Sequence, residues 1–280
     1  MSFYITKSTG QKELFSIKKF KRSLKKAGAP DSLIKQIIKD IETKPQMRTT
    51  KEIYEYALSF LHKKNRPLAA RYNLKKALMD LGPAGYSFET FIAELFRAQK
   101  YKVNREQIFK GICVNHEVDV SALKKNNLYM VECKFHNRRG LKSDVKVALY
   151  IKARFDDIHF AWKKDKNNSH KFHSAWIVTN TTFTSEAIKY GTCAQIHMLD
   201  WKNPKGQALP DIINKYGLHP ITALTTLNSK QKKQCIKAGF VLCKDAHKYA
   251  NILHKLKFSE QEVKNLITEA EQVCSFSKKK

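Results

Sequence analysis

The sequence predicts an α/β protein in which a central α/β region has helical regions on both sides. Two observations carry this prediction. The 280 residues exceed what one hydrophobic core usually organises, so two or three domains are expected. Between residues 87 and 199, amphipathic helix patterns alternate with short apolar runs typical of strands, whereas the flanking regions show mainly helical spacing of apolar residues.

The first region, residues 1–82, is predicted to open with two short strands and to continue as helices. The two strands are expected at residues 3–6 and 13–16, and the polar turn between them at residues 8–11. Apolar residues then recur at helical spacing in three stretches, residues 34–41, 53–61 and 68–79. Leu81-Gly82-Pro83 ends the last helix, because glycine and proline interrupt helices.

The central region, residues 83–205, is predicted to alternate helices and strands. Helices are expected from residue 87 and over residues 144–160 and 185–190. Strands are expected around Tyr101, Ile112 and Val118 and over residues 129–135, 175–178 and 196–199. Residues 124–127, Lys-Lys-Asn-Asn, suit a tight hairpin because asparagine tolerates positive φ. Residues 206–280 are predicted to be helical.

Charge and cysteine content narrow the class of protein. The chain carries 53 Lys and Arg against 25 Asp and Glu, a formal net charge of +28. Such a field attracts polyanions such as nucleic acid, although lysines on solvated helix faces give the same composition. The six cysteines include no C-x-x-C pair, so neither a zinc ribbon nor a thioredoxin-like site is indicated. No stretch has signal-peptide character or membrane-spanning length, so a cytoplasmic protein without membrane contact is expected.

One cluster of charged residues in the central region points to chemistry. It lies in HEVDVSALKKNNLYMVECKFH, residues 116–136. Glu132 and Lys134 share one face of a strand, because side chains alternate along a strand, and the hairpin is expected to bring Asp119 beside them. As a bare pattern, Asp followed by Glu-x-Lys also arises by chance in half-exposed strands.

This cluster suits the hydrolysis of phosphodiester bonds. A divalent metal ion bears the negative charge that develops on phosphorus and activates a bound water. Asp119 and Glu132 supply the hard oxygen ligands that Mg²⁺ prefers, Mn²⁺ is an alternative ion, and the main-chain carbonyl of Cys133 lies between them. Lys134 is a cation suited to holding the water deprotonated or stabilising the transition state.

The central region resembles the Mrr-type restriction endonucleases, a branch of the PD-(D/E)XK nucleases. The similarity covers about residues 83–201 and rests on GYSFETFIAELFRAQKYKV, HEVDV, YMVECKFH and AWIVTNTTFTSEAIKYG followed by IHMLDW. It implies a restriction-endonuclease-like mixed sheet flanked by helices, and a magnesium-dependent DNA endonuclease. By this resemblance Asp119, Glu132 and Lys134 match the catalytic motif. Glu89 matches an acidic helix residue that reaches the metal, and the neighbouring Glu94 is its alternative.

Further residues around the cluster are candidates for supporting roles. His116 and His136 flank the acidic residues and are candidates either for phosphate or metal contacts or for structural roles. Basic residues follow the catalytic strand and are expected to contact backbone phosphates or to form a solvated loop. They are Arg138, Arg139, Lys142 and Lys146.

The first region resembles an ATP-cone, a regulatory nucleotide-binding module. The similarity covers residues 3–82 and rests on ITKSTGQKELFSIKKFKRSLKKAG, MRTTKEIYEYALSFL and LAARYNLKKAL. It implies ATP or dATP as a ligand whose phosphates lysines near a helix start neutralise. The implied contact residues are Lys7, Glu13, Ser16, Lys19, Arg22 and Thr50. Ser8 and Thr9 stand where such cones place Arg-Asp, so a degenerate cone that only docks on a partner is the alternative.

Residues 221–246, ITALTTLNSKQKKQCIKAGFVLCKDA, partly resemble a helix-hairpin-helix, which presents backbone amides to DNA phosphates. Gly239 alone stands at the turn, where that motif has two glycines. A plain helical bundle is therefore the alternative for this region.

Three functional hypotheses follow. The first is a metal-dependent endonuclease that cuts duplex or branched DNA under nucleotide control, in restriction, defence or repair. The second is a non-catalytic, nucleotide-responsive DNA-binding regulator, because ATP-cones also occur in repressors. The third is a nuclease directed at RNA, which shares the chemistry and differs in substrate. A single site cuts one strand, so double-strand cleavage requires a homo-oligomer or two encounters.

Overall fold

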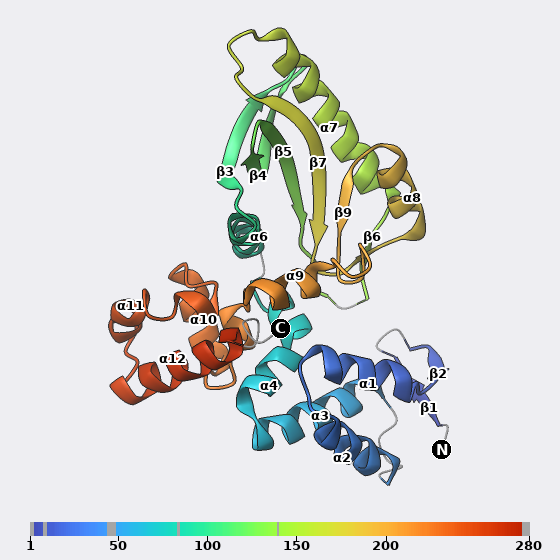
Figure 1. Cartoon of the computed structure of the whole chain (residues 1–280), viewed down its shortest axis with the longest axis vertical. Coiled ribbons are helices and arrows are strands. Elements are labelled where there is room, and N and C mark those ends of the chain that lie inside the picture. The colour runs from blue at the N-terminus through green and yellow to red at the C-terminus, as the bar shows by residue number, and fades with distance from the viewer. Residues whose placement is uncertain (1–2, 8–9, 44–48, 83–84, 139, 276–280) are drawn as a thin grey trace. The chain divides into compact units, whose positions relative to one another are not determined.

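The computed structural model describes residues 3–7, 10–43, 49–82, 85–138 and 140–275, and the chain forms two compact units (Figure 1). Unit 1 combines Met1–Leu78 with His219–Lys280, and unit 2 is Met79–Leu218. Along the sequence, unit 2 is therefore inserted between the two segments of unit 1. Among the described residues, no helix is long and apolar enough to cross a membrane.

Unit 1 is mostly helical. Its N-terminal segment holds β1 (Tyr4–Thr6), β2 (Lys12–Leu14), α1 (Ile17–Lys26), α2 (Asp31–Glu42), α3 (Thr50–Lys64), α4 (Arg66–Tyr72) and α5 (Leu74–Met79). Its C-terminal segment holds the 3-10 helices η1 (Ile221–Ala223) and η2 (Cys243–Asp245) and the helices α10 (Ser229–Lys237), α11 (Ala250–Lys255) and α12 (Glu260–Ser275). The predicted strands, turn and helices of the first region are present within a few residues, except that Ser8 and Thr9 lie outside the described residues.

Polar side chains set the helix boundaries of the N-terminal segment. Ser16 caps α1 by accepting the Lys19 N–H, and Thr49 and Glu52 form a reciprocal capping box at the start of α3. The apolar pattern predicted one helix over residues 68–79, but the structure has α4 and α5 with a break at Asn73. Buried Asn73 accepts a hydrogen bond of 2.6 Å from the Tyr54 hydroxyl, and a side chain that bonds away from the helix favours such a break.

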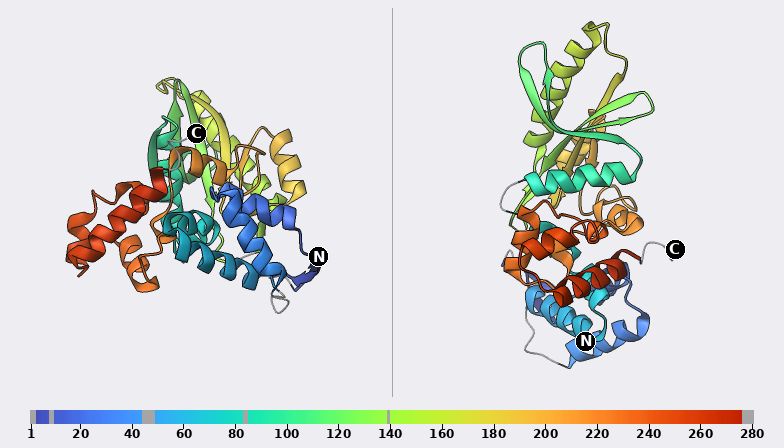
Figure 2. Two further views of the ribbon diagram at one scale, coloured as in Figure 1. Left: turned by 60° about the horizontal axis from the view of Figure 1, so that its bottom comes forward. Right: turned by 90° about the vertical axis from the view of Figure 1, so that its left-hand side faces the viewer.

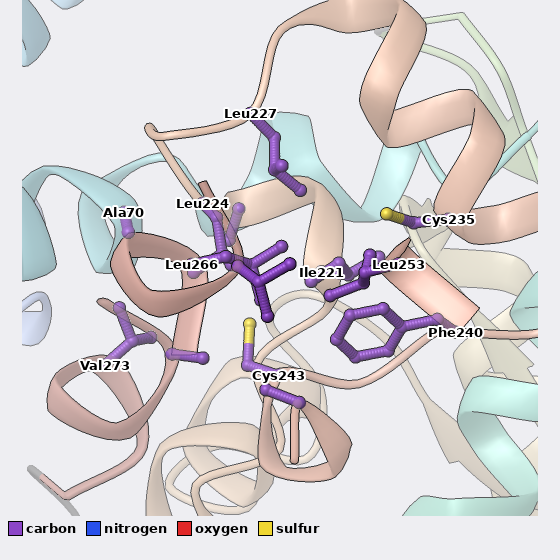
Figure 3. Close-up of a cluster of buried hydrophobic side chains, with 14 of the residues drawn as sticks. Ala70, Ile221, Leu224, Leu227, Cys235, Phe240, Cys243, Leu253, Leu266 and Val273 are labelled. Carbon is purple, nitrogen blue, oxygen red and sulfur yellow. The ribbon is translucent and has the colours of Figure 1, made fainter. Parts of the chain in front are cut away.

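The two segments of unit 1 share one hydrophobic cluster (Figure 3). Ala70 and Ala77 of the N-terminal segment belong to the same buried cluster as Phe240 and Leu266 of the C-terminal segment. A buried hydrogen bond of 2.6 Å from the Thr222 hydroxyl to the Ala77 carbonyl joins them as well. The C-terminal helices therefore complete the core of the N-terminal ones.

Residues 221–246 contain one α-helix, α10, between two 3-10 helices, whereas a helix-hairpin-helix has two α-helices. Gly239 follows α10 with a φ of 78°, a left-handed conformation that glycine adopts without strain. It ends the helix and lets Phe240 turn back into the hydrophobic cluster.

Unit 2 is a mixed sheet of order β3-β4-β5-β7-β9 with helices on both faces. Strands β3 (Lys102–Lys110), β4 (Asn115–Lys124) and β5 (Asn127–Lys134) are antiparallel, and β7 (Lys171–Thr179) and β9 (His197–Leu199) run parallel to β5. The helices are α6 (Tyr86–Ala98), α7 (Val145–Lys164), α8 (Ser185–Cys193) and α9 (Leu209–Tyr216). A short parallel pair completes the unit, β6 (Lys142–Ser143) with β8 (Thr182–Phe183). The predicted α/β architecture with a mixed sheet is confirmed.

Helices of opposite faces enclose the core of this sheet (Figure 2). On one face, Met130 and Ile177 of the strands pack with Ile151 and Ile158 of α7. On the other, α6 lies against the first strands, and Phe96 contacts Trp176 edge to face at 5.5 Å. Burial on both faces explains why the inner strands are nearly continuously apolar.

Two local predictions for unit 2 require correction. The β4–β5 hairpin is present with Lys124 opposite Asn127, but Lys125 carries the positive φ of 56° instead of an asparagine. The strand expected around Ile112 is a turn. The carboxylate of Asp157 in α7 accepts the backbone N–H groups of Cys113 and Val114 at 2.8 and 3.3 Å, so this segment bonds to a side chain and not to a strand.

The ladder between β3 and β4 is interrupted near its centre. Arg105 pairs with Val120 and Gln107 with Val118, so the register is the same on both sides, but Glu106 and Asp119 between them do not form a regular ladder pair. Glu106 adopts a φ of 52° at this point. No residue is inserted in either strand, but a left-handed residue departs from the extended conformation and so bends the ribbon locally. It also frees Asp119 from regular pairing within β4.

The buried histidine of unit 1 predicts an acid-sensitive fold. His219 is 1% exposed and neither ring nitrogen has a hydrogen-bond partner among the described residues. Burial, and the positive charge of Arg71 nearby, lower its pKa to about 3. The unfolded chain takes up this proton near pH 6.5, so stability falls as pH drops below that value, by up to about 1.4 kcal/mol per pH unit. We expect His219→Leu to remove this slope in urea unfolding measured by circular dichroism.

The exposed residue His254 in α11 provides the matched control, because His254→Leu removes a histidine without touching the core. Its pH dependence should follow that of the wild type. Identical slopes for the wild type and His219→Leu would contradict the assignment.

Candidate active site

Glu132, near the end of β5, is the centre of the site. Glu132 is 4% exposed, and both of its carboxylate oxygens have cationic partners. Lys134 Nζ lies 2.7 Å from Oε1, and a guanidinium nitrogen of Arg154 lies 2.6 Å from Oε2. A buried carboxylate without such partners is costly, so both cations contribute to holding the Glu132 side chain in place. The structure thus brings Glu132 and Lys134 together as the alternation of side chains predicted.

Asp119 reaches the same place from β4. Its Oδ2 atom accepts the backbone N–H of Cys133 at 2.7 Å, which ties the interrupted part of β4 to β5 beside Glu132. Burial and the charges of Glu132 and Glu89 raise the pKa of Asp119 to about 7. Burial thus disfavours the charged form of Asp119 most, and the neighbouring carboxylates add to that effect.

Two acidic residues of α6 were alternatives for a third carboxylate, and the structure separates them. Glu89 is half-buried in the first turn, and burial together with Glu106 raises its pKa; Glu132 also contributes. Its charge in turn raises the pKa of Asp119. Glu94 instead pairs with Arg97 at 2.5 Å on the same helix. Of the two residues, Glu89 therefore interacts electrostatically with Asp119 and Glu132.

Arg154 is a site residue that the sequence analysis missed. It comes from α7, and besides binding Glu132 it donates a hydrogen bond to the Glu117 carbonyl. The signal was present in the sequence: Arg154 lies between Ile151 and Ile158, three and four residues away, on the stripe of α7 that faces the core. A cation on an apolar helix face indicates a buried anion opposite.

The two histidines beside the cluster have structural partners. His116 Nε2 lies 2.8 Å from the carboxylate of Asp157. The His136 ring contacts the Ser143 hydroxyl at 3.0 Å, while its backbone N–H and carbonyl both bond to the Asn180 side chain. These contacts link β4 to α7 and the end of β5 to the end of β7. Both histidines are thus engaged in holding elements together.

Basic side chains follow the end of β5. Arg138, Lys142 and Lys146 are exposed, and Lys146 lies in the first turn of α7. Arg139 lies outside the described residues. Exposed cations that follow β5 in the sequence are available to attract a polyanion.

The residues present fit a magnesium ion by their chemistry. Among the described residues, no three His, Cys, Asp or Glu side chains form a group that holds a metal by itself. Mg²⁺, however, usually binds through one or two carboxylates and keeps water or phosphate oxygens as its other ligands. Asp119 and Glu132 supply two carboxylates, and the raised pKa of Asp119 reflects its burial first and the neighbouring carboxylates second, both of which a bound cation would offset.

A second candidate site lies in unit 1. A pocket of about 220 Å³ is lined by residues of β1, β2, α1, α3 and α4. Four of the six predicted nucleotide contacts line it, namely Glu13, Ser16, Lys19 and Thr50. The other two, Lys7 and Arg22, are not among its lining residues, and Lys7 pairs with Glu13 at 2.6 Å. The Lys7 contact lowers the pKa of Glu13.

Comparison with known proteins defines the class of unit 2. Residues 83–203 match the restriction endonuclease family, in agreement with the mixed sheet and with the Mrr-type resemblance of the motifs. Unit 2 is thus a restriction-endonuclease-type nuclease domain. Residues 219–274 match a second family, described as AF1548-like, C-terminal. Residues 1–82 fall outside both matches, so the ATP-cone resemblance rests on the sequence motifs alone.

The chain belongs to the AF1548-like family. It is 32% identical over 183 residues to an uncharacterized protein of Archaeoglobus fulgidus, a match that covers 65% of this chain and 99% of the relative. The crystal structure of AF1548, a protein of unknown function, aligns over 69% of this chain and 99% of its own, with 30% identity and a TM-score of 0.56. The restriction endonuclease MspJI, solved with a 27-mer oligonucleotide, aligns over 52% of this chain and 31% of its own at 11% identity and a TM-score of 0.34, which supports no further conclusion.

The raised pKa of Asp119 predicts that its neutralisation stabilises the fold. Asp119 keeps its proton up to about pH 7 when folded. In the unfolded chain it loses the proton near pH 4, so the stabilisation by the protonated form is full below about pH 4 and is lost as pH rises to neutrality. We expect Asp119→Asn to raise the free energy of unfolding at about pH 8 by about 1–3 kcal/mol.

Urea unfolding at alkaline pH measures this change. Asp156→Asn is the control, because it removes a carboxylate of α7 that pairs with Lys152 at the surface. It should leave stability unchanged or slightly lower it. A loss of stability in Asp119→Asn would contradict the raised pKa of Asp119.

Proposed function

We propose that the chain is a magnesium-dependent DNA endonuclease whose activity responds to ATP or dATP, with a role in restriction, defence or repair. The observation that carries the proposal is the buried pair of carboxylates, Asp119 and Glu132, with Lys134 beside it in a restriction-endonuclease-type domain. Perturbed titratable groups of this kind concentrate where chemistry is carried out.

Each residue of the pair has a defined part in the proposed reaction. Asp119 and Glu132 would hold Mg²⁺ through carboxylate oxygens, with the Cys133 carbonyl as a further ligand and Glu89 facing them from α6. The ion supplies charge neutralisation at phosphorus and a bound water of lowered pKa. The Asp119 contact to the Cys133 N–H fixes the position of that carboxylate before substrate arrives.

Lys134 and Arg154 have different parts. Lys134 is partly exposed, so its ammonium group is open to a phosphate oxygen or the attacking water while it stays in contact with Glu132. Arg154 is more deeply buried and holds the other oxygen of Glu132, with its guanidinium over the Tyr150 ring at 5.3 Å. Lys134 is therefore assigned to the reacting phosphate, and Arg154 to the orientation of Glu132.

A cleavage assay on plasmid DNA tests this function. With Mg²⁺, the wild-type protein should convert supercoiled plasmid to nicked or linear forms. Glu132→Gln and Asp119→Asn should each slow cleavage by at least about a hundred-fold, because each removes a charged group that acts in the transition state. Glu94→Gln should keep activity, since Glu94 pairs with Arg97 away from the pair.

The competing hypotheses give different outcomes in the same assay. A non-catalytic regulator binds DNA in a salt-sensitive manner, independently of Lys134→Ala, and leaves every plasmid form intact with or without nucleotide. An RNA-directed nuclease cleaves an RNA strand faster than a DNA strand of equal sequence. Either result would exclude the DNA endonuclease.

The nucleotide part of the proposal rests on the pocket of unit 1. Lys19 is exposed in the first turn of α1 and lines the pocket, so its ammonium group is available to a phosphate there. Phe15, Tyr54 and Tyr72 line the same pocket and provide aromatic surface for a base. Thr50 contacts the pocket from the start of α3.

Isothermal titration with ATP and dATP tests the pocket directly. We expect Lys19→Ala to weaken binding about ten-fold, because it removes one charge-assisted contact to phosphate. The matched control is Lys35→Ala, an exposed lysine of α2 that does not line the pocket. No binding of either nucleotide to the wild type would leave docking as the role of this region.

A further inference from the structure

A large pocket in unit 2 is lined by none of the candidate site residues that the sequence motifs predicted. Its volume is about 850 Å³. Ligand pockets usually enclose roughly 300–1,000 Å³. Residues from three places line it: β3 with the turn after it, the inner strands β4 and β5, and the end of α7 with the loop that follows.

The pocket lies where the end of the β3–β4 ribbon curls toward the rest of the sheet. Phe109 lies opposite His116, beyond Glu106 along β3, whereas Phe172 lies opposite Leu128 near the hairpin end of the sheet. The rings of Phe109 and Phe172 are nevertheless 5.8 Å apart. The outer half of the ribbon must therefore curl back toward β5 and β7, and the concavity beneath it is the pocket.

One wall of the pocket is aromatic and held in place. Trp162 lies 5.8 Å from Phe109, ring centre to ring centre. Its indole N–H donates to the His170 carbonyl at 2.7 Å, and its own carbonyl accepts the side-chain amide of Asn168 at 3.0 Å. A ring fixed in this way offers a stacking surface at little cost in conformational entropy.

The remaining lining is polar and basic. Lys102, Lys110 and Lys164 line it and are exposed, and Asp165 is the one acidic residue among the described lining residues. Asn104 offers an amide that both donates and accepts hydrogen bonds. An aromatic wall, an amide and a basic rim together match a nucleobase that carries a phosphate.

The pocket opens on the same face of the sheet as Glu132. Ser121 lines the pocket and lies opposite Met130, whose side chain packs against α7. Glu132 is two residues further along β5, so the two positions are about 7 Å apart along the strand. One strand of nucleic acid is long enough to occupy both.

We propose that this pocket binds an unpaired nucleotide of the nucleic acid strand on which the carboxylate pair acts. The base lies against Trp162 and Phe109, and the lysines contact the flanking phosphates. The inference rests on the proposed nuclease function for the identity of the strand, and it adds a preference for nucleic acid with at least one unpaired base.

Binding without metal separates this proposal from cleavage. The full chain, in EDTA, is titrated into duplexes that contain 2-aminopurine either unpaired in a bulge or fully paired. Stacking in the pocket should quench the unpaired probe, and the bulged duplex should bind at least about five-fold more tightly than the paired one, as expected for one stacked base. Trp162→Leu should abolish the quenching.

Exposed positions keep the test valid if the core variant fails to fold. Ile108 lines the pocket and is 73% exposed, so Ile108→Glu places a negative charge at the pocket without disturbing packing. It should abolish the preference for the bulge, as should Lys102→Glu. Lys189→Ala, on α8 and outside the pocket, is the charge control and should leave the preference intact.

Two results would overturn the proposal. Equal affinity for bulged and paired duplexes with no change in probe emission, in protein that still cleaves plasmid, would exclude the pocket as a base site. Displacement of the bulged duplex by dAMP at equal affinity would assign the pocket to free nucleotides. If plasmid cleavage fails while the bulge preference holds, the nuclease proposal falls and the base site stands.

Discussion

The break in pairing between β3 and β4 is the constraint on which the nuclease unit depends. The ladder keeps its register, but the pair Glu106 and Asp119 is absent from it, and Glu106 adopts a positive φ at this point. Asp119 then bonds through its side chain to the Cys133 N–H, which sets a carboxylate beside Glu132. Beyond this point the outer half of the ribbon curls over the sheet and encloses the large pocket. The candidate catalytic geometry and the neighbouring binding surface thus both lie at one local irregularity.

The electrostatics of the site follow from burial of like charges. Glu132 is buried between Lys134 and Arg154, while Asp119 accepts the backbone N–H of Cys133 and, among the described residues, has no cation bonded to it. Its raised pKa is the consequence. A site of this kind is less stable than a neutral one, and the energy is recovered only when a cation or a phosphate-bound cation arrives. At this position, protein stability and the proposed binding of a metal ion therefore favour opposite charge states of Asp119.

In unit 1, part of the hydrophobic core depends on contacts between the N-terminal and C-terminal segments. Ala70 and Ala77 of the N-terminal helices are covered by Phe240, Leu266 and their neighbours from the C-terminal segment (Figure 3). The apolar stripes of α1, α2 and α3 pack together in a cluster formed by N-terminal residues alone. The face that carries Ala70 and Ala77 is buried instead with residues of the C-terminal segment, His219–Lys280, which has 62 residues.

The sequence by itself determined the helices and strands, the hairpin after β4, and the meeting of Asp119, Glu132 and Lys134. Each of these depends on contacts between residues close in sequence, for which periodicity and turn chemistry are sufficient. Only the tertiary structure decided the pairing of Arg154 with Glu132 and the turn around Ile112. It also decided the shared core of unit 1 and the pocket beside Trp162. These features depend on which elements pack together, and a side chain on α7 or in the C-terminal segment leaves no local pattern that names its partner. The stripe position of Arg154 signalled a buried anion but not which one.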